Sequence, residues 1–343
     1  MATVGSSPLR LWAAGRVGTA DENLSTPVAR FIDAARKEVM LGSQQLGDRT
    51  VVDALLGAVR RGCRVRVFLE KDYLFESPPI PRPWQATGEN EPNRKAFMAI
   101  LRGGIGATLD SRSALFHSNF AVRDPAGPAA AILVTSANFT TSCLQRHWES
   151  LALIEDATFA REFAREFIRC WEGAKEDFVD SPTVRDIGGV PEKAVFGPRH
   201  QPEMEVMKQI EKATQKVRFA LYTFSSSSGL DDALSSAIQR GVDVQGVLDQ
   251  QQQGQQWEVA TRLRTAGAAI RWLGSETRKL HHKLVTVDDR VVILGTFNFS
   301  RAARFSHETI LVIGDAQTAA DAQLRIARGI TNEIERLIRL GTP

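Results

Sequence analysis

The residue types best suited to chemistry stand close together in the C-terminal half of the chain. His281, Lys283 and Asp288 are spaced as H-x-K-x4-D. The run 280–287 predicts a strand, and alternate residues of a strand share a face, so His281 and Lys283 would lie side by side. An imidazole can attack phosphorus or donate a proton while an ammonium neutralises phosphate oxygens. This spacing therefore indicates chemistry on a phosphate ester.

A predicted turn and a second strand follow this motif. Asp288 begins the turn, and the apolar residues 291–294 would return antiparallel to the first strand. Such a hairpin would bring Thr296 and Asn298 close to His281. Since a hydroxyl and an amide can each hold a phosphate oxygen or orient an imidazole, we expect both residues to bind substrate.

The N-terminal half contains the same pattern with one change. His117, Asn119 and Asp124 are spaced as H-x-N-x4-D, and Ser136 and Asn138 follow at the corresponding distance. Asparagine can donate a hydrogen bond to phosphate but brings no charge, and a charge-assisted contact is roughly twice as strong as a neutral one. We expect Asn119, Ser136 and Asn138 to bind substrate as their counterparts do.

The exchange of lysine for Asn119 leaves three interpretations open. The site could be naturally asymmetric, with Arg123 or another cation supplying the missing charge. The asparagine could be a substitution that slows turnover. The first half could also be degenerate, which would make the protein mainly a phosphate binder. The residues alone do not separate these possibilities.

An internal repeat supports the pairing of the two motifs. The segments 52–70 and 231–249 both read as an amphipathic helix followed by a strand, with Gly62 and Gly241 at the predicted helix ends. Later in each half, Glu149 and Glu308 stand some ten residues beyond the motif asparagine. Because element order and residue type agree over this length, the chain is predicted to be a duplication.

With both motifs in view, the chain resembles the phospholipase D superfamily. The second motif matches H-x-K-x4-D in full, with Thr296 where a serine is usual, and the first matches apart from Asn119. Glu149 and Glu308 also resemble the family pattern and are expected in the substrate site. The resemblance covers nearly the whole chain.

The resemblance implies a mechanism and the roles of several residues. One histidine would attack phosphorus to form a phosphohistidine, and the other would protonate the leaving oxygen and then activate water or an alcohol. By analogy, His117 would be the nucleophile and His281 the acid. Asp124 and Asp288 would support the histidines or lock the interface between the halves. No metal ion and no cofactor is implied.

Alternating helices and strands predict an α/β fold. We expect two homologous phospholipase D-like α/β/α sandwich halves packed with pseudo-two-fold symmetry. The first would span residues 9–180 and the second 191–340, with 181–190 as the linker. The 343 residues are ample for two such cores.

Composition narrows the setting of this chemistry. The net charge of +3 is too mild to argue for a nucleic-acid partner by itself, and no run approaches the length of a membrane helix. The three cysteines have no metal-binding spacing, so we expect reduced thiols in a cytoplasmic protein. Oligomeric state is left open by the sequence.

Three functions remain as hypotheses at this point. A metal-independent nuclease acting on DNA or RNA is favoured, because the chain is compact and shows no clear lipid anchor. The alternative is a phospholipase D or phosphatidyltransferase acting on lipid headgroups, for which the proline-rich stretch 73–91 would supply a modest apolar surface. The third is a catalytically impaired, phosphate-binding homologue.

Overall fold

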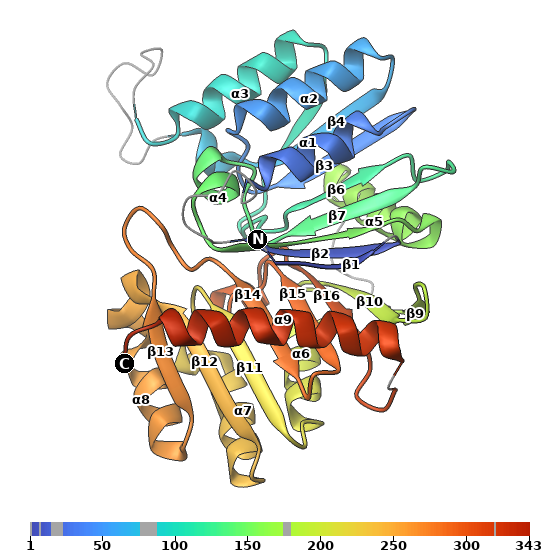
Figure 1. Ribbon diagram of the computed structural model, residues 1–343. Helices are drawn as coiled ribbons and strands as arrows, with labels where there is room; N and C mark the ends of the chain where they lie inside the picture. Colours follow the sequence, from blue (N-terminus) through green and yellow to red (C-terminus); the bar gives the residue numbers. More distant parts are fainter. Residues whose placement is uncertain (1, 7, 15–22, 76–87, 174–179, 319) are drawn as a thin grey trace.

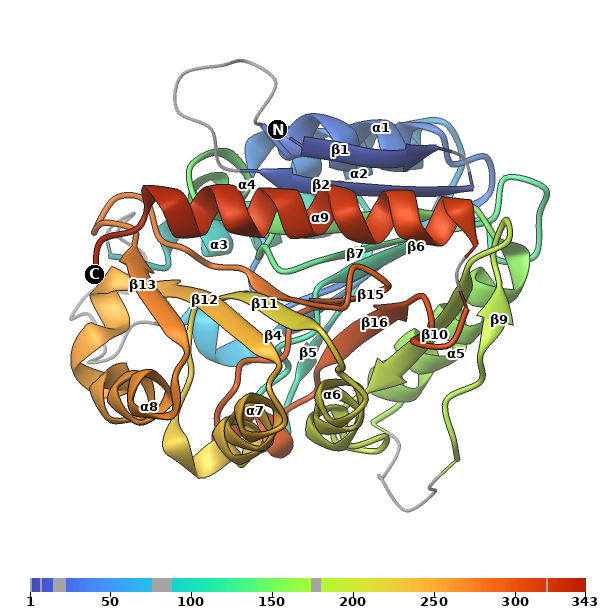
Figure 2. The ribbon, with the colours of Figure 1, turned by 60° about the horizontal axis from the view of Figure 1, so that its bottom comes forward.

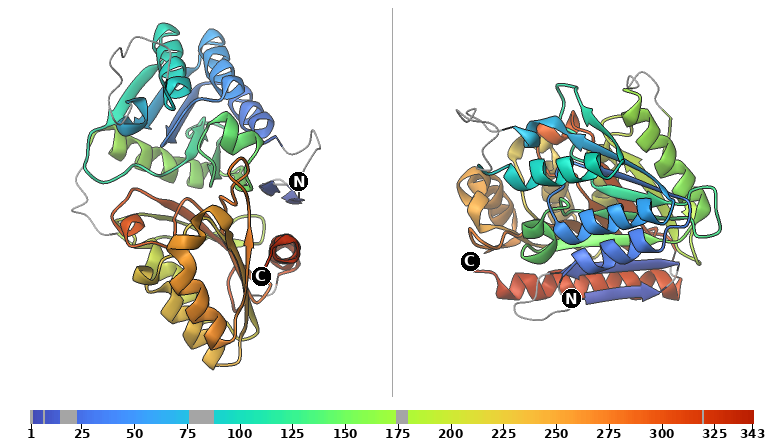
Figure 3. Two further views of the ribbon diagram at one scale, coloured as in Figure 1. Left: turned by 90° about the vertical axis from the view of Figure 1, so that its left-hand side faces the viewer. Right: turned by 90° about the horizontal axis from the view of Figure 1, so that it is seen from above.

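The structure, a computed structural model, consists of two α/β halves stacked on each other (Figure 1). It describes residues 2–6, 8–14, 23–75, 88–173, 180–318 and 320–343. Residues 76–87, most of the proline-rich stretch, lie outside the described residues. The expected two-half α/β architecture is confirmed, and Figure 3 (left) shows the halves one above the other.

Each half is built on one eight-stranded mixed sheet. The order in the first half is β1-β2-β8-β7-β6-β3-β4-β5, and in the second it is β13-β12-β11-β14-β15-β16-β10-β9. The strands of the first sheet are β1 (Ala2–Ser6), β2 (Leu9–Ala14), β3 (Glu38–Ser43), β4 (Arg64–Glu70), β5 (Gly106–Asp110), β6 (Phe120–Arg123), β7 (Ala131–Thr135) and β8 (Glu149–Ile154). Those of the second are β9 (Arg185–Asp186), β10 (Pro191–Phe196), β11 (Lys216–Leu221), β12 (Asp243–Asp249), β13 (Ala269–Leu273), β14 (Lys283–Val287), β15 (Val291–Gly295) and β16 (Thr309–Ile313).

The same pairing pattern recurs in both sheets. In each, three strands run parallel (β3, β4 and β5; β11, β12 and β13). The first strand of each motif hairpin pairs antiparallel with one of them, β6 with β3 and β14 with β11. The hairpins are β6–β7 and β14–β15, the elements that carry the two motifs. The predicted return of residues 291–294 antiparallel to the motif strand is confirmed by the register Leu284↔Leu294.

Helices cover the outer faces of both sheets. The first sheet carries α1 (Ser25–Asp33), α2 (Arg49–Arg60), α3 (Glu91–Arg102) and the short α4 (Thr141–Gln145), and the second carries α6 (Pro202–Glu211), α7 (Leu230–Gln239) and α8 (Gln253–Ala266). Gly62 and Gly241 follow α2 and α7 with φ of +85° and +87°. Both predicted helix ends are thus confirmed, because this left-handed conformation favours glycine.

A central core joins the two halves. It contains side chains of α5 (Ala157–Trp171), α9 (Asp321–Leu340) and the inner faces of both sheets, such as Phe120, Phe163, Leu284 and Ile334. The long helix α9 crosses the second sheet and also contacts β1 and β2 of the first (Figure 2). Because one core is shared, the halves are held in a fixed relation, and this relation positions the motifs.

The predicted domain starts at Leu9 and Pro191 coincide with the first residues of β2 and β10. The first sheet begins with β1, ahead of the predicted start at Leu9, and β1 pairs with β2 from Ala2 onward. The predicted linker 181–190 contains β9, which pairs with β10 at the edge of the second sheet. Among the helices that the structure describes, none combines the length and the apolar composition needed to cross a bilayer.

Glu192 is an unusual feature of the central core. It lies on the face of β10 that also carries Ala194 and Phe196, and it is only 1% exposed. Neither carboxyl oxygen has a hydrogen-bond partner. Burial, with a smaller contribution from Asp156 and Asp186, raises the pKa of this carboxyl well above its ordinary value. The folded protein therefore keeps Glu192 protonated where the unfolded chain would ionise it.

This linkage predicts how stability depends on pH. Above the ordinary glutamate pKa the unfolded chain releases a proton that the folded protein retains, so Glu192 lowers stability as the pH rises toward its folded pKa. We expect Glu192→Gln to lose less free energy of unfolding than the wild type between about pH 5 and about pH 8. The difference should grow by about 1.4 kcal/mol for each pH unit below the folded pKa of Glu192. Urea unfolding at both pH values measures this. The exposed Glu172→Gln variant is the control, and equal slopes for all three proteins would contradict the expectation.

Candidate active site

The two halves exchange backbone hydrogen bonds at the motif histidines. The amide of His117 donates to the carbonyl of His307 in the other half, at 2.9 Å. The amide of His281 donates to the carbonyl of Trp148 in the first half, also at 2.9 Å. Because the same crossing occurs twice, each histidine is fixed against the opposite half by pseudo-two-fold symmetry.

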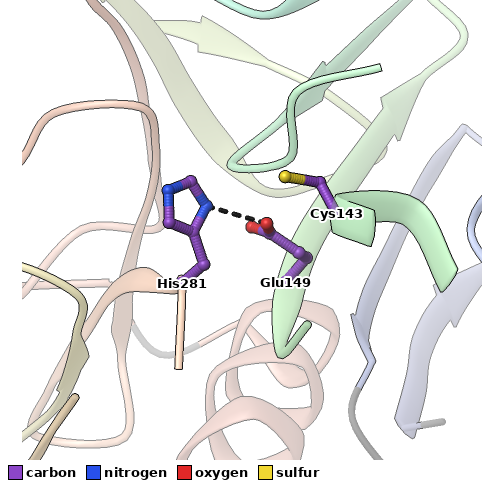
Figure 4. Close-up of side chains that lie close together, drawn as sticks. All are labelled: Cys143, Glu149 and His281. Atoms are coloured by element: carbon purple, nitrogen blue, oxygen red, sulfur yellow. Dashed lines mark hydrogen bonds and ion pairs between the residues drawn. The ribbon is translucent and has the colours of Figure 1, made fainter. Parts of the chain in front are cut away.

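Each histidine also pairs with a glutamate from the opposite half. His117 Nδ1 lies 2.9 Å from both carboxylate oxygens of Glu308, and His281 Nδ1 lies 2.7 Å from Glu149 Oε1 (Figure 4). All four side chains are buried. A carboxylate only accepts, so Nδ1 carries a hydrogen in each ring. Nε2 is then the reacting atom, as a nucleophile or base without a hydrogen and as an acid with one.

Two hydroxyl groups hold these glutamates in place. Ser136 Oγ donates to Glu149 and Thr296 Oγ1 donates to Glu308, each at 2.5 Å. Each hydroxyl also accepts the backbone amide of the residue that follows its glutamate. A direct substrate contact of these four residues stays a prediction. They orient the histidines from behind, since their polar atoms are used within the protein.

Lys283 lies against His281, as the strand periodicity predicted. Its Nζ is 3.0 Å from His281 Nε2 and donates to the carbonyl of His281 at 2.9 Å. The strand β14 begins at Lys283, so His281 stands just before it rather than inside it. Burial lowers the pKa of Lys283 to about 8, against the opposing effect of Glu149 and Glu308.

The electrostatics of His281 reflect charges from both halves of the chain. Burial lowers the pKa of His281 well below its usual value, and the charges of Lys283 and then His117 lower it further. Burial also raises the pKa of Glu149 to about 7, with Lys283 and Ser136 acting in the opposite direction. The charge of His117 thus acts on His281, although 164 positions separate the two residues in the sequence.

The three motif asparagines are buried or half-buried, and each has an amide atom without a partner. These atoms are Asn119 Nδ2, Asn138 Oδ1 and Asn298 Oδ1. Asn119 Oδ1 accepts from Ser43 Oγ at 2.7 Å. A substrate role for the three residues stays a prediction.

The motif aspartates lie away from the histidines. Asp124 accepts the backbone amides of residues 36–38, and Asp288 accepts those of residues 214–216, each at 2.8 Å. Seven residues separate each aspartate from its histidine, a span of about 20 Å in extended chain. The expected catalytic or interface role stays a prediction. Both aspartates close a turn, with φ of +46° and +52°, and fasten it to the start of the neighbouring strand.

Arg123 does not replace the missing lysine. It stands next to Asp124 at the far end of β6, and its guanidinium pairs with Glu155 at 3.2 Å and donates to the carbonyl of Ala129 at 2.9 Å. The compensating cation considered from the sequence is therefore not Arg123, and in the part of the chain that the structure describes the neutral Asn119 stands at the motif position of Lys283.

Two positioning carboxylates were missed in the sequence. Glu70 accepts the amide of Phe116 at 2.8 Å, and Asp249 accepts the amide of Leu280 at 2.6 Å. Each thereby fixes the residue just before a motif histidine. Burial raises the pKa of Asp249 to about 6. The sequence contained a sign of this role, because an acidic residue ends both repeated segments, 52–70 and 231–249.

One cluster beside the site has the side-chain types of a metal centre. Potential ligand atoms of Cys143, Glu149 and His281 lie within 4.8 Å of one another (Figure 4). Burial raises the pKa of the Cys143 thiol to about 12, and the Lys283 ammonium is 3.2 Å from His281 Nδ1. A protonated thiol and a neighbouring cation both oppose a divalent ion. The residues suit an anionic phosphate better than a metal.

A family model decides the relationship of the chain. The model described as "Cardiolipin synthase, PLD-like domain" matches residues 28–171 and 206–330, which is more than half of the chain. The chain belongs to the phospholipase D superfamily. Its two matched segments coincide with the two halves, and the resemblance found in the sequence is confirmed.

Individual relatives are more distant. The chain is 32% identical to a phospholipase D of Rickettsia typhi over 117 residues, which are 33% of this chain and 55% of the relative. It is 29% identical to a mitochondrial cardiolipin hydrolase of Mus musculus over 114 residues, 33% of this chain and 42% of the relative. The chain thus spans about half the length of the curated relatives it matches. A phosphatidylserine synthase of Haemophilus influenzae Rd KW20 shares the fold with a TM-score of 0.70 over 99% of this chain and 88% of that chain, at 13% identity.

The lowered pKa of Lys283 predicts how anion binding depends on pH. The ammonium is present below its pKa of about 8 and is lost above it, so affinity for a phosphate diester should fall as the pH rises through this value. Dimethyl phosphate, whose own charge is constant over this range, can be titrated by phosphorus NMR. Lys283→Arg should keep its affinity to higher pH, because guanidinium stays charged. An unchanged wild-type affinity well above pH 8 would show that Lys283 does not hold the anion.

Proposed function

We propose that the chain is a phosphodiesterase that breaks and re-forms phosphorus–oxygen bonds through a covalent phosphohistidine, without a metal ion. The observation that carries the proposal is the crossed pair of histidine–glutamate contacts, His117 with Glu308 and His281 with Glu149. Two buried imidazoles, each with Nδ1 held by a carboxylate, supply a nucleophile and an acid for a single phosphorus atom.

The broken symmetry of the site favours His281 as the nucleophile. Lys283 Nζ is 3.0 Å from His281 Nε2, and this ammonium opposes protonation of the ring. His117 has the neutral Asn119 in the corresponding place and the Glu308 carboxylate 2.9 Å from its Nδ1, and we assign it the role of proton donor. This order is the reverse of the one implied by the family resemblance, in which His117 attacks.

The reaction proceeds in two balanced steps. His281 Nε2 attacks phosphorus, the bond to the leaving oxygen breaks, and that oxygen takes the proton of His117 Nε2. Water or an alcohol then gives its proton to His117 while its oxygen attacks phosphorus, and the phosphorus–nitrogen bond breaks to restore His281. Lys283 neutralises the non-bridging oxygens in both steps, which is where charge builds up.

Two substrate classes fit this chemistry. Nucleic acid is the class that the compact sequence favoured. A phospholipid headgroup is supported by the names of the relatives and by two exposed phenylalanines, Phe75 (65%) and Phe305 (63%). Phe305 lies two residues before His307, the partner of the His117 amide, and would suit contact with an apolar lipid surface.

The substrate class is tested directly in the presence of EDTA. Single-stranded DNA, duplex DNA, RNA and phosphatidylcholine or phosphatidylglycerol vesicles are incubated with the wild type, His117→Ala and His281→Ala. We expect cleavage of one class by the wild type and a loss of about 10²–10⁴-fold in each variant. A strict metal requirement, or near-full activity of His281→Ala, would rule out the paired-histidine mechanism.

The order of the histidines is tested with bis(p-nitrophenyl) phosphate, whose leaving group departs without a proton. His117→Ala should release a burst of p-nitrophenol equal to the protein present and leave a phosphorylated His281, identified by mass spectrometry. His281→Ala should show neither signal, because it lacks the attacking nitrogen. The opposite pattern, with the adduct on His117, would restore the order implied by the family resemblance.

A further inference from the structure

The His117 side of the site contains two buried amide atoms without partners. They are the donor Nδ2 of Asn119 and the acceptor Oδ1 of Asn138. The two side chains are only 1% and 6% exposed. Buried polar groups in proteins are nearly always hydrogen-bonded, and an unpaired one is costly. An unpaired donor and an unpaired acceptor in one site therefore mark a position for a ligand.

The remaining atoms of these amides are fixed by the protein. Asn119 Oδ1 accepts from Ser43 Oγ at 2.7 Å and from the amide of Gln44 at 3.2 Å. Asn138 Nδ2 donates to Gln44 Oε1 at 2.9 Å, and Gln44 Nε2 donates to the hydroxyl of Tyr73 at 3.1 Å. Because Gln44 contacts both asparagines, the two amides belong to one connected group whose free atoms are held in place.

The second half is built differently at the corresponding positions. Tyr222 directly follows β11 as Gln44 follows β3, and its ring centroid lies 4.6 Å from that of His281. Gln252 donates to its hydroxyl at 3.2 Å. Lys283 takes the place of Asn119, with its ammonium 5.3 Å from the Tyr222 ring. One side of the site is therefore cationic and suits an anion, whereas the other is neutral and offers a donor and an acceptor.

A hydroxyl group is the chemical partner that satisfies both free atoms. It accepts from Asn119 Nδ2 and donates to Asn138 Oδ1, as water also does. A phosphate diester oxygen has no hydrogen to donate, and an ammonium has no lone pair to accept with. An alcohol that reaches this position replaces the water. The reacting oxygen of an alcohol is already engaged with phosphorus and His117. The hydroxyl bound by the asparagines must then be a further one on the same molecule.

We propose that Asn119 and Asn138 form a subsite for a polyhydric alcohol, either the leaving alcohol or the acceptor that replaces it. This inference rests on the proposed function. With His281 attacking, the leaving oxygen departs on the opposite side of phosphorus, next to His117 and Asn119. The acceptor enters at the same place in the second step. The exchange of lysine for Asn119 thus changes what is recognised beside His117, from an anion to a hydroxyl.

The subsite is tested by competition between acceptors. Wild-type protein turns over bis(p-nitrophenyl) phosphate in equal concentrations of glycerol and 1-propanol, and phosphorus NMR measures the two transfer products. We expect the glycerol ester to exceed the propanol ester by about tenfold, the effect of a paired buried hydrogen bond. Asn119→Ala and Asn138→Ala should each bring the ratio close to that of free alcohols. Asn298→Ala, at the matching motif position of the second half, should change the rate but leave the ratio.

Each outcome bears on the subsite. No release of p-nitrophenol by the wild type removes the proposed function and the subsite with it. Release without a glycerol ester, or a ratio that Asn119→Ala leaves unchanged, overturns the subsite alone. If Asn119→Ala does not fold, as judged by thermal unfolding, Asn119→Asp keeps the acceptor atom and removes the donor, and it should lose the same preference. Methyl riboside in place of glycerol shows whether a sugar or a glycerol group fits better, and a preference for either over propanol supports the subsite.

Discussion

The site depends on one constraint, that each motif histidine is held by a carboxylate from the opposite half. Without the second half, His117 Nδ1 would lose its carboxylate partner, and Glu308 would lose the imidazole that it accepts from. A buried, unpaired carboxylate is costly, and here the cost is offset by the imidazole on one side and by the Thr296 hydroxyl on the other. The same packing that joins the two halves therefore also orients the two histidines.

The central core provides the rigidity that this arrangement needs. Side chains of both sheets, α5 and α9 pack in a single cluster, so a shift between the halves would disturb many contacts at once. Hydrogen bonds from four carboxylates position the backbone next to each motif. Glu70 and Asp249 fix the chain before each histidine, and Asp124 and Asp288 fix the turn beyond each motif strand. Each motif is thereby held at both ends.

The pseudo-two-fold symmetry brings one histidine from each half to the site, and the differences between the halves make the two histidines unequal. A strictly two-fold site would have two equivalent histidines with equal tendencies to attack or to protonate. The exchange of Lys283 for Asn119 and of Tyr222 for Gln44 makes the two sides chemically different. In our proposal the cationic side neutralises phosphate beside the attacking imidazole, and the neutral side receives an alcohol beside the proton donor. Duplication followed by divergence of a few residues accounts for both properties.

Much of this protein could be predicted from the sequence because the informative patterns are local. Helix ends at Gly62 and Gly241, the antiparallel motif hairpin and the shared face of His281 and Lys283 follow from backbone preference and from strand periodicity. The duplication was visible because residue types repeat in order. These patterns were sufficient to predict the fold class, the family and the two candidate catalytic histidines.

The roles of the supporting residues were decided only by the tertiary structure. Asp124 is close to His117 in sequence but about a strand's length away in space, whereas Glu308 is far in sequence and in contact with its ring. Ser136 and Thr296 hold glutamates, and Arg123 pairs with Glu155. Buried polar groups are nearly always hydrogen-bonded, and only the folded structure shows which partner lies within reach. Sequence spacing determines which side chains share a strand face, but the packing of one half on the other determines which groups meet across the interface.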